Sequence, residues 1–460
     1  MIRRSFLQKA AAFAGASSAL LSTQILSSCS SQKSAKNSEK PNIVVIVLDD
    51  AGWGDVGYHG SICKTPTIDK MARECVELDR FYVNPTCSPT RAALLTGKPA
   101  SRSGILSPIN YNQTHSLPAG TPTIADMLGD HGYDTAISGK WHLGWSQDAI
   151  PNNYGFNHSY GYLHGWIDQY THLTRDEIPT WHRNGDLIEE HGHATDLIAD
   201  NAVDYVKNTR DKSKPFFLYV PFSVPHLPIQ EDSGHVYQYR EILDSESERF
   251  YAASMTHVDE AIGKLMSTLD GELLREDTLV IFFSDNGATA PGPKNYLTPA
   301  PTINTTSETG NYGSNLPLRG WKGGLYEGGI RVPAIISWPG NLDAAKVPDA
   351  ISVCDIFPTL AHIAGVDMGE YPDVEGINIC PAFEGRALPE DRVIYWRTPQ
   401  GMAVRKGGWK IIHRGKSPAD GTTELYDLSV DQYEEHDLAS VNTAKLEELK
   451  AELARNFSLD

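Results

Sequence analysis

Four oxygen-bearing side chains stand at the ends of two strongly apolar segments. Asp49 and Asp50 follow the run NIVVIVL at 42–48, and Asp285 and Asn286 closely follow TLVIFF at 278–283. Such runs are typical of strands buried on both faces, and in an open α/β sheet the ligand crevice lies beyond the strands' carboxyl ends. Carboxylate and amide oxygens suit Ca²⁺ or Mg²⁺ rather than Zn²⁺. Strand-end Asp and Asn residues also cap turns, and either pair alone favours that simpler interpretation.

A third group of residues favours the binding of an anion. The segment CSPTR, from Cys87 to Arg91, continues as AALLT and predicts a helix that ends at Gly97. The side chain of Cys87 then lies at the helix N-terminus, where free N–H groups and the helix dipole favour negative charge. Arg91 lies one turn further on, so its guanidinium can reach the same place.

The elements that must position these residues alternate between strands and helices. A third buried strand is predicted at 215–220, and helical patterns occupy 67–74, 91–95, 123–131, 195–208 and 250–269. This alternation predicts an α/β fold with a largely parallel sheet and helices on both faces. Short strands at 392–396, 401–405, 409–413 and 424–427, followed by a helix at 444–456, predict a small antiparallel sheet with one helix.

The motif CSPTR with AALLTGK resembles the signature of the type I sulfatases, whose C-x-P-x-R cysteine is oxidised to Cα-formylglycine. Further blocks follow in the family's order: DDAGWGD at 49–55, GKWHLG at 139–144, Pro225-His226, SDNG at 284–287, GWKG at 320–323 and EGGIRVP at 327–333. The blocks are most similar to arylsulfatases and N-acetylgalactosamine-6-sulfatases. The resemblance implies the alkaline-phosphatase-like fold, in which a large, mixed, mostly parallel sheet lies between helices.

The resemblance also implies a complete catalytic site. A divalent cation, Ca²⁺ or alternatively Mg²⁺, would be held by Asp49, Asp50, Asp285, Asn286 and an oxygen of modified Cys87. One hydroxyl of the formylglycine hydrate would attack sulfur, and the second would lose its proton to release sulfate. An unmodified thiol lacks that second hydroxyl.

The same resemblance assigns roles to five further residues. Arg91 and Lys140 would stabilise the negative charge of the diol and the sulfate, and His142 would be the base that triggers sulfate release. His226 and Lys322 would act on the leaving group. His257 and Arg331 are secondary candidates without an assigned role.

These inferences predict a sulfuric ester hydrolase that acts on a sulfated sugar or an aryl sulfate. Two alternatives stay open: a phosphodiesterase or phosphonate monoester hydrolase of the same superfamily, and a non-catalytic lipoprotein that binds sulfated glycans. A formylglycine-generating enzyme or an anaerobic sulfatase-maturating enzyme would be the maturation partner. The net charge of −18 argues against a nucleic-acid partner.

The first residues have the composition of an export signal. Arg3 and Arg4 precede an Ala-rich apolar stretch, and Leu26-Ser-Ser-Cys29 resembles the lipobox of bacterial lipoproteins. We therefore expect a signal peptide at 1–28, a tether at 29–40, a catalytic domain at 41–365 and a C-terminal subdomain at 366–460. A lipid on Cys29 would anchor the protein in the periplasm or outer membrane of a Gram-negative bacterium.

Two segments and four cysteines carry weaker expectations. Residues 154–193 hold seven aromatic rings and six histidines, which suit either a sugar-binding surface or a loop wrapped on the core. The Gly/Pro-rich segment 291–317 is a second place to look for specificity. Whether Cys63, Cys75, Cys354 and Cys380 form disulfides or stay free thiols is left open by their spacing.

Overall fold

The computed structural model describes residues 40–110, 115–290, 292–293 and 310–460. The predicted signal peptide, Cys29 and nearly all of the tether lie outside these residues, as does most of the segment 291–317. Among the described residues, no helix is long and apolar enough to cross a membrane.

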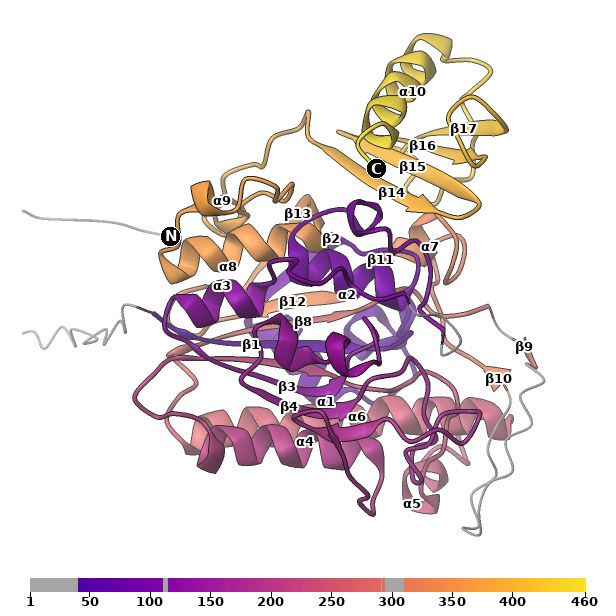
Figure 1. Ribbon diagram of the computed structural model, residues 1–460. Helices are drawn as coiled ribbons and strands as arrows, with labels where there is room; N and C mark the ends of the chain where they lie inside the picture. The colour runs from indigo at the N-terminus through magenta and orange to yellow at the C-terminus, as the bar shows by residue number, and fades with distance from the viewer. Residues whose placement is uncertain (1–39, 111–114, 291, 294–309) are drawn as a thin grey trace, which may run out of the picture. The chain divides into compact units, whose positions relative to one another are not determined.

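A mixed sheet of 11 strands forms the centre of the protein (Figure 1). Its central strands run parallel in the order β8-β1-β7-β3-β4, and antiparallel strands extend it on both sides. The strands are β1 Asn42–Leu48, β2 Val76–Tyr82, β3 Asp134–Lys140, β4 His158–Tyr162, β5 Trp181–Arg183, β6 Asp186–Leu187, β7 Phe216–Pro221, β8 Thr278–Ser284, β11 Arg331–Val332, β12 Ala334–Ser337 and β13 Ala345–Ser352.

Helices cover both faces of this sheet, as predicted. Alternate residues of β1 face two separate apolar cores: Ile43, Val45 and Val47 one of them, and the intervening residues the other. Because β1 is buried on both faces, its apolar run is uninterrupted. The first core includes α2 Cys87–Thr96, α3 Ile124–Asp130 and α8 Ile356–Ala364, and the second includes α1 Pro66–Glu74, α4 Ala194–Asp204 and α6 Glu246–Gly271. Shorter helices are α5 Ser233–Tyr237, α7 Glu327–Ile330 and α9 Cys380–Phe383.

A four-stranded antiparallel sheet follows near the C-terminus (Figure 1). One face packs on α10, and the other packs on Tyr82, Leu325 and Ile330 of the larger unit. Its elements are β14 Val393–Thr398, β15 Gly401–Lys406, β16 Trp409–Arg414, β17 Thr422–Asp427 and α10 Thr443–Phe457, and a separate two-stranded ladder joins β9 Gly292–Pro293 to β10 Gly310–Asn311. The predicted large sheet and small C-terminal sheet are therefore confirmed.

The predicted division at 365/366 stays a prediction. Val366, Ile379 and Leu388 belong to the same core as α2 and α8.

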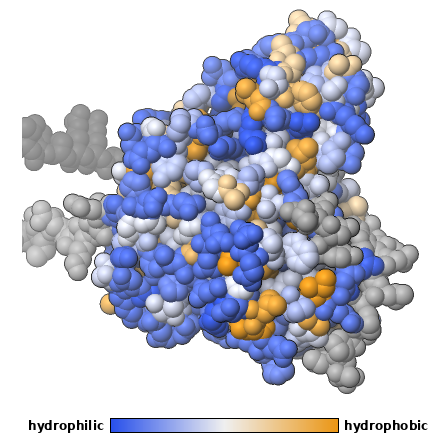
Figure 2. All heavy atoms as spheres, viewed as in Figure 1, coloured by the Kyte–Doolittle hydropathy of each residue, from blue (hydrophilic) through white to orange (hydrophobic). Residues whose placement is uncertain are grey.

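The face of the molecule in Figure 2 is mostly hydrophilic, with apolar residues scattered between polar ones. Such scattering is ordinary for a folded protein surface.

The cysteines in the described part of the chain are free thiols. Cys63, Cys75, Cys87 and Cys354 are buried, and Cys380 is partly buried. The alternative of free thiols, left open by the sequence, is therefore the one observed.

Candidate active site

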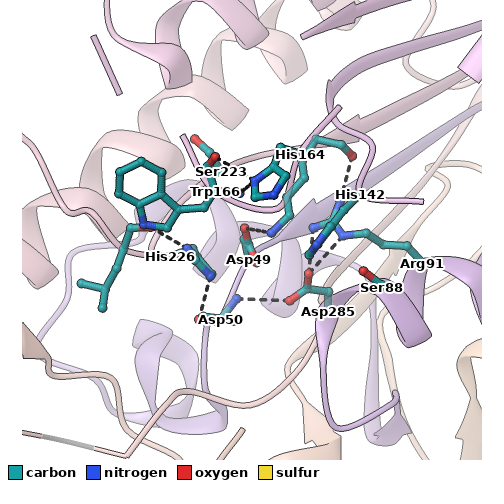
Figure 3. A network of polar contacts seen from close by, with 12 residues as sticks. Asp49, Asp50, Ser88, Arg91, His142, His164, Trp166, Ser223, His226 and Asp285 are labelled. Atoms are coloured by element: carbon teal, nitrogen blue, oxygen red, sulfur yellow. Dashed lines mark hydrogen bonds and ion pairs between the residues drawn. The ribbon is translucent and has the colours of Figure 1, made fainter. Parts of the chain in front are cut away.

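The ten predicted site residues come together at the carboxyl ends of the central strands. Asp49 and Asp50 follow β1, Asp285 and Asn286 follow β8, Lys140 ends β3 with His142 just beyond, and His226 lies in the segment after β7. Cys87 and Arg91 come from α2, and Lys322 comes from the segment before α7. Figure 3 shows Asp49, Asp50 and Asp285 between Arg91 on one side and His226 on the other.

Backbone contacts between neighbouring strands fix the carboxylates. The N–H of Asp285 donates to the Leu48 carbonyl at 2.9 Å, and the N–H of Asp49 donates to the Val224 carbonyl at 3.1 Å. Asp50 has a left-handed backbone with φ 71°, and its N–H donates to Oδ1 of Asp285 at 3.2 Å. Non-glycine residues adopt this backbone rarely, and such strain is concentrated at functional sites.

Glycines allow the strand ends to approach closely. A Cβ atom on Gly139, which has φ +136°, would lie 1.9 Å from the carbonyl oxygen of Pro221. A Cβ on Gly287 would lie 1.8 Å from the carbonyl oxygen of Gly328. Any side chain at these two positions would therefore displace Lys140 or Asn286, the neighbouring site residues.

Two basic side chains, those of Lys140 and Arg91, are buried at the inner end of the site. Nζ of Lys140 donates to Oδ2 of Asp49 at 2.5 Å. Arg91 donates to Oδ2 of Asp285 from Nε at 3.2 Å and from a terminal nitrogen at 2.7 Å, and its other terminal nitrogen donates to the Lys140 carbonyl at 2.9 Å. All four side chains are at most 1% exposed. This end can therefore hold a compact anionic group away from water.

The opposite end of the site opens toward solvent. Lys322 donates to Oδ1 of Asp50, and Nε2 of His226 lies 3.8 Å from Oδ2 of the same carboxylate. The side chains of Lys322 and His226 are 15% and 19% exposed. A substrate that places its charged group against Arg91 and Lys140 would therefore leave its larger part beside Lys322 and His226.

Two buried oxygen atoms of the site have no hydrogen-bond partner. They are Oδ1 of Asp49 and Oδ1 of Asn286. The amide nitrogen of Asn286 donates to Oδ1 of Asp50 at 2.8 Å and to the Gly287 carbonyl at 2.9 Å, so its oxygen is left for another ligand. Single ligand atoms of Asp49, Cys87 and Asp285 lie within 4.8 Å of one another. Buried oxygens without partners are costly unless they bind something, and this donor set suits Ca²⁺ or Mg²⁺.

The two adjacent aspartates have opposite pKa shifts. Burial raises the pKa of Asp49 to about 7, because it outweighs the attraction of Lys140. Burial acts on Asp50 as well, but Lys322 and His226 outweigh it and lower the pKa of that carboxyl. Burial also raises the pKa of the Cys87 thiol. An unmodified Cys87 would therefore be a protonated thiol, which is a poor nucleophile and a poor metal ligand.

His142 is poised to accept a proton. Its Nε2 lies 3.1 Å from the Ile109 carbonyl, which can only accept, so Nε2 carries the hydrogen and Nδ1 has the lone pair. Nδ1 is buried without a hydrogen-bond partner. Burial and the nearby Lys140 lower the pKa of His142 well below its usual value. The ring is thus a neutral base.

The groups at the open end differ in charge. Burial lowers the pKa of His226 to about 3, and its Nδ1 lies 2.6 Å from the Leu227 carbonyl. Burial would also lower the pKa of Lys322, but the attraction of Asp50 outweighs burial and raises it. Lys322 is therefore positively charged at this end, while the imidazole of His226 is neutral.

Of the two alternatives left open for residues 154–193, the structure favours aromatic rings that pack on the core. Five of its seven rings are buried in the cores: Tyr154, Phe156, Tyr160, Tyr162 and Trp181. They are buried because β4 and β5 continue the central sheet through this segment. Trp166 and Tyr170 are partly exposed.

His164 lies beside the site and was not singled out from the sequence. Its ring centroid is 6.1 Å from that of His142, and its Nδ1 accepts the N–H of Trp166 at 3.2 Å (Figure 3). Its only sequence signal was membership of the histidine-rich segment. Arg331, a secondary candidate, instead donates from Nε to the Asp79 carbonyl at 2.9 Å.

Comparisons with known proteins agree with this geometry. A family model described as Sulfatase matches residues 41–366. N-acetylgalactosamine-6-sulfatase from Canis lupus familiaris is 32% identical over 394 residues, which cover 81% of this chain and 71% of that protein. Arylsulfatase J from Mus musculus is 33% identical over 384 residues, which cover 80% of this chain and 60% of that protein.

A solved structure supports the same assignment. The crystal structure of Ps i-CgsB in complex with k-i-k-neocarrahexaose is 30% identical, with a TM-score of 0.79 over 89% of this chain and 91% of its own. The fold is thus that of the alkaline-phosphatase-like superfamily, as predicted. The chain belongs to the sulfatase family, whose members are enzymes that hydrolyse sulfate esters.

Proposed function

We propose that this protein removes sulfate from sulfated carbohydrates, using a formylglycine formed from Cys87 and a divalent cation. The observation that carries the proposal is the pair of buried, unpartnered oxygens on Asp49 and Asn286, beside the Cys87 side chain. Asp50 and Asp285 complete an all-oxygen donor set that fits Ca²⁺, with Mg²⁺ as the alternative. The carbohydrate class is supported by the similarity to N-acetylgalactosamine-6-sulfatase and to a structure solved with a neocarrahexaose.

A formylglycine hydrate at position 87 would supply the attacking hydroxyl, and a cation held by the four oxygen ligands would supply positive charge for the sulfate oxygens. The chain's own residues do the remaining work. Arg91 and Lys140 hold the sulfate group at the buried end, where low dielectric strengthens their attraction. Nδ1 of His142 would accept the proton that the remaining hydroxyl at position 87 must lose for sulfate to leave. Lys322 gives the departing sugar oxygen the proton that it needs, because an alkoxide is a poor leaving group. The neutral His226 lies at the same end, where its Nε2 can accept a hydrogen bond from the sugar and hold the departing oxygen in place.

The burial of the site restricts what part of a substrate can enter. Arg91 and Lys140 are almost completely buried, so we propose that the sulfate binds beside them and that the sugar stays at the open end. Trp166 is partly exposed, and Figure 3 places it on the same side of the site as His226. We propose that it borders that open end. We further propose that the protein is exported, carries a lipid on Cys29 and depends on a formylglycine-forming enzyme.

The decisive experiment measures sulfate release from a panel of sulfated mono- and oligosaccharides, with 4-nitrophenyl sulfate and 4-nitrophenyl phosphate alongside. Mass spectrometry of the peptide that contains residues 81–91 reports whether Cys87 is modified. We expect sulfate release by protein that carries the modification. Faster turnover of the phosphate ester would favour the phosphohydrolase alternative, and an unmodified, inactive protein from its native host would favour the glycan-binding alternative.

A further inference from the structure

A buried cluster of charged side chains lies at the end of the segment that carries His226. His257 of α6 stands between two carboxylates: Nδ1 lies 2.8 Å from Oε2 of Glu231, and Nε2 lies 3.3 Å from Oδ1 of Asp196 on α4. The Glu231 side chain has no exposed surface, and that of His257 is 8% exposed. Glu231 is only five positions beyond His226.

His257 is doubly protonated in this arrangement. A neutral imidazole has one N–H and would turn a lone pair toward one of the two carboxylates, whereas an imidazolium donates to both. Burial opposes the charge, but Asp196 and Glu231 outweigh it and raise the pKa of His257 to about 10. The remaining nearby groups are His193 and His235, with ring centroids 4.7 and 4.6 Å away, and His235 itself contacts Asp232 and Glu260.

The hydrogen bonds argue against a metal ion at this cluster. Ligand atoms of His193, Glu231 and His257 lie close enough to share one. However, Nδ1 of His193 accepts the N–H of Thr195 at 3.2 Å, so Nε2 must carry the hydrogen, which it donates to the Gln230 carbonyl at 2.7 Å. His193 thus has no lone pair to offer, and the cluster functions as a salt bridge.

Side-chain hydrogen bonds also hold the segment 222–231 near both of its ends. The side chain of Gln230 accepts the N–H of Gln169 at 2.7 Å and donates to Asp168 at 2.7 Å. At the start of the segment, the hydroxyl of Ser223 donates to Oε1 of Gln169 at 2.9 Å. His226 lies between these anchors, so its position depends on both ends of the segment.

We propose that His257 is a positioning residue for the leaving-group end of the active site. Its imidazolium neutralises the buried Glu231 carboxylate and so holds the segment that presents His226. The proposal rests on the proposed function, in which His226 acts beside the departing oxygen.

The test compares two substrates that differ in their leaving group. A sugar sulfate releases an alkoxide that needs a proton, whereas 4-nitrophenyl sulfate releases a stable phenolate that does not. We expect His257→Gln to lower kcat on the sugar sulfate by about ten- to a hundredfold, as small displacements of catalytic groups do, and to affect 4-nitrophenyl sulfate much less. KM should change little, because Arg91 and Lys140 are untouched. His226→Ala should show the same selective loss.

Two further variants separate positioning from simple instability. Glu231→Gln/His257→Gln replaces the ion pair by two amides, which avoids leaving a buried carboxylate unpaired, and we expect it to recover activity relative to His257→Gln. Asp196→Asn, at the exposed end of the cluster, should give a weaker form of the same selective loss even if His257→Gln fails to fold. The control is His158→Gln, which removes a histidine–aspartate pair with Asp134 at the amino ends of β3 and β4, away from the carboxyl ends that form the site, and should leave both activities unchanged.

Each outcome decides the proposal. Selective loss in both His226→Ala and His257→Gln supports it, as does recovery in the double variant. Selective loss in His226→Ala, with equal loss on both substrates in His257→Gln and Asp196→Asn, would overturn it while leaving the proposed function intact. Equal loss in His226→Ala itself would refute the proposed role of His226, and the inference with it.

Discussion

The ammonium of Lys140 lies 2.5 Å from Oδ2 of Asp49, and both side chains are completely buried. The second oxygen of Asp49 has no hydrogen-bond partner. Lys140 therefore neutralises the carboxylate from one side and leaves the other side for a cation. Asp285 pairs in the same way with Arg91, and Asp50 pairs with Lys322. The chain's own basic residues therefore neutralise much of the negative charge that the three aspartates bring to the site.

Removing this ammonium should destabilise the metal-free protein. Lys140→Met leaves the Asp49 carboxylate buried without its partner, and breaking a buried ion pair in this way typically costs about 3–5 kcal/mol. Urea unfolding in the presence of EDTA measures the change in the free energy of unfolding. The control is Lys264→Met, which removes an exposed ion pair with Asp200 and should change stability by at most about 1 kcal/mol. Equal effects of the two variants would contradict the assignment of the Lys140 pair.

Binding of Ca²⁺ should stabilise the fold. A ligand present at about a hundred times its Kd adds about 2.7 kcal/mol to the free energy of unfolding, which thermal unfolding with and without Ca²⁺ detects as a higher Tm. Asn286→Ala removes an oxygen ligand without changing the charge and should reduce this shift. The exposed Asn341→Ala should retain it. A full shift in Asn286→Ala would argue against Asn286 as a ligand.

Cys87→Ala should abolish sulfate release with little loss of stability. Compared with the unmodified chain, the variant removes one sulfur atom from a buried position, and we expect a cost of about 1 kcal/mol, similar to one buried methylene group. Sulfate release and thermal unfolding check the two parts separately. Cys354→Ala is the matched control, because Cys354 is also a buried free thiol but lies outside the site. Residual activity of Cys87→Ala near that of the wild type would refute the assigned nucleophile.

Stability should depend on pH through His257. Its pKa rises from 6.5 to about 10 on folding, so its contribution is fully present below about pH 6.5 and is lost as the pH rises through about 10. Over this window the free energy of unfolding of the wild type should fall more steeply than that of His257→Gln, by up to about 1.4 kcal/mol per pH unit. Urea unfolding of both proteins at several pH values gives the difference. Parallel curves would show that His257 does not hold the extra proton.

The strands that could be predicted from the sequence are those whose residues are apolar on both buried faces. β1, β7 and β8 are continuous apolar runs, and the residues after β1 and β8 were correctly expected to meet. β3, with the sequence DTAISGK, was not predicted although it is fully buried and ends in Lys140. The polar side chains of β3 have hydrogen-bond acceptors that lie far away in the sequence. The hydroxyl of Ser138 donates to the Ile198 carbonyl, and that of Thr135 donates to the Gly155 carbonyl. Such long-range partners leave no periodic signal.

Other parts of the site could not be inferred from residue types alone. Composition does not tell an aromatic ring that faces a sugar from one that faces the core, and five rings of 154–193 proved to be core residues. The acidic net charge likewise does not reveal the charge of the site, because it is averaged over the whole chain, whereas the site itself gathers Arg91, Lys140 and Lys322. His257 acts through Glu231 and Asp196, which are 26 and 61 positions away in the sequence.

The contact between Arg91 and Asp285 spans 194 positions of the chain. A ribosome that adds about 5–20 residues per second needs roughly 10–40 s to make that much chain after Cys87. Until β8 exists, α2 lacks the strand against which its arginine is anchored, and Cys87, which is 2% exposed in the finished fold, has not yet been enclosed. The length of chain between the two halves of the site therefore sets a time window during synthesis in which the proposed formylglycine-forming enzyme would have access to this cysteine.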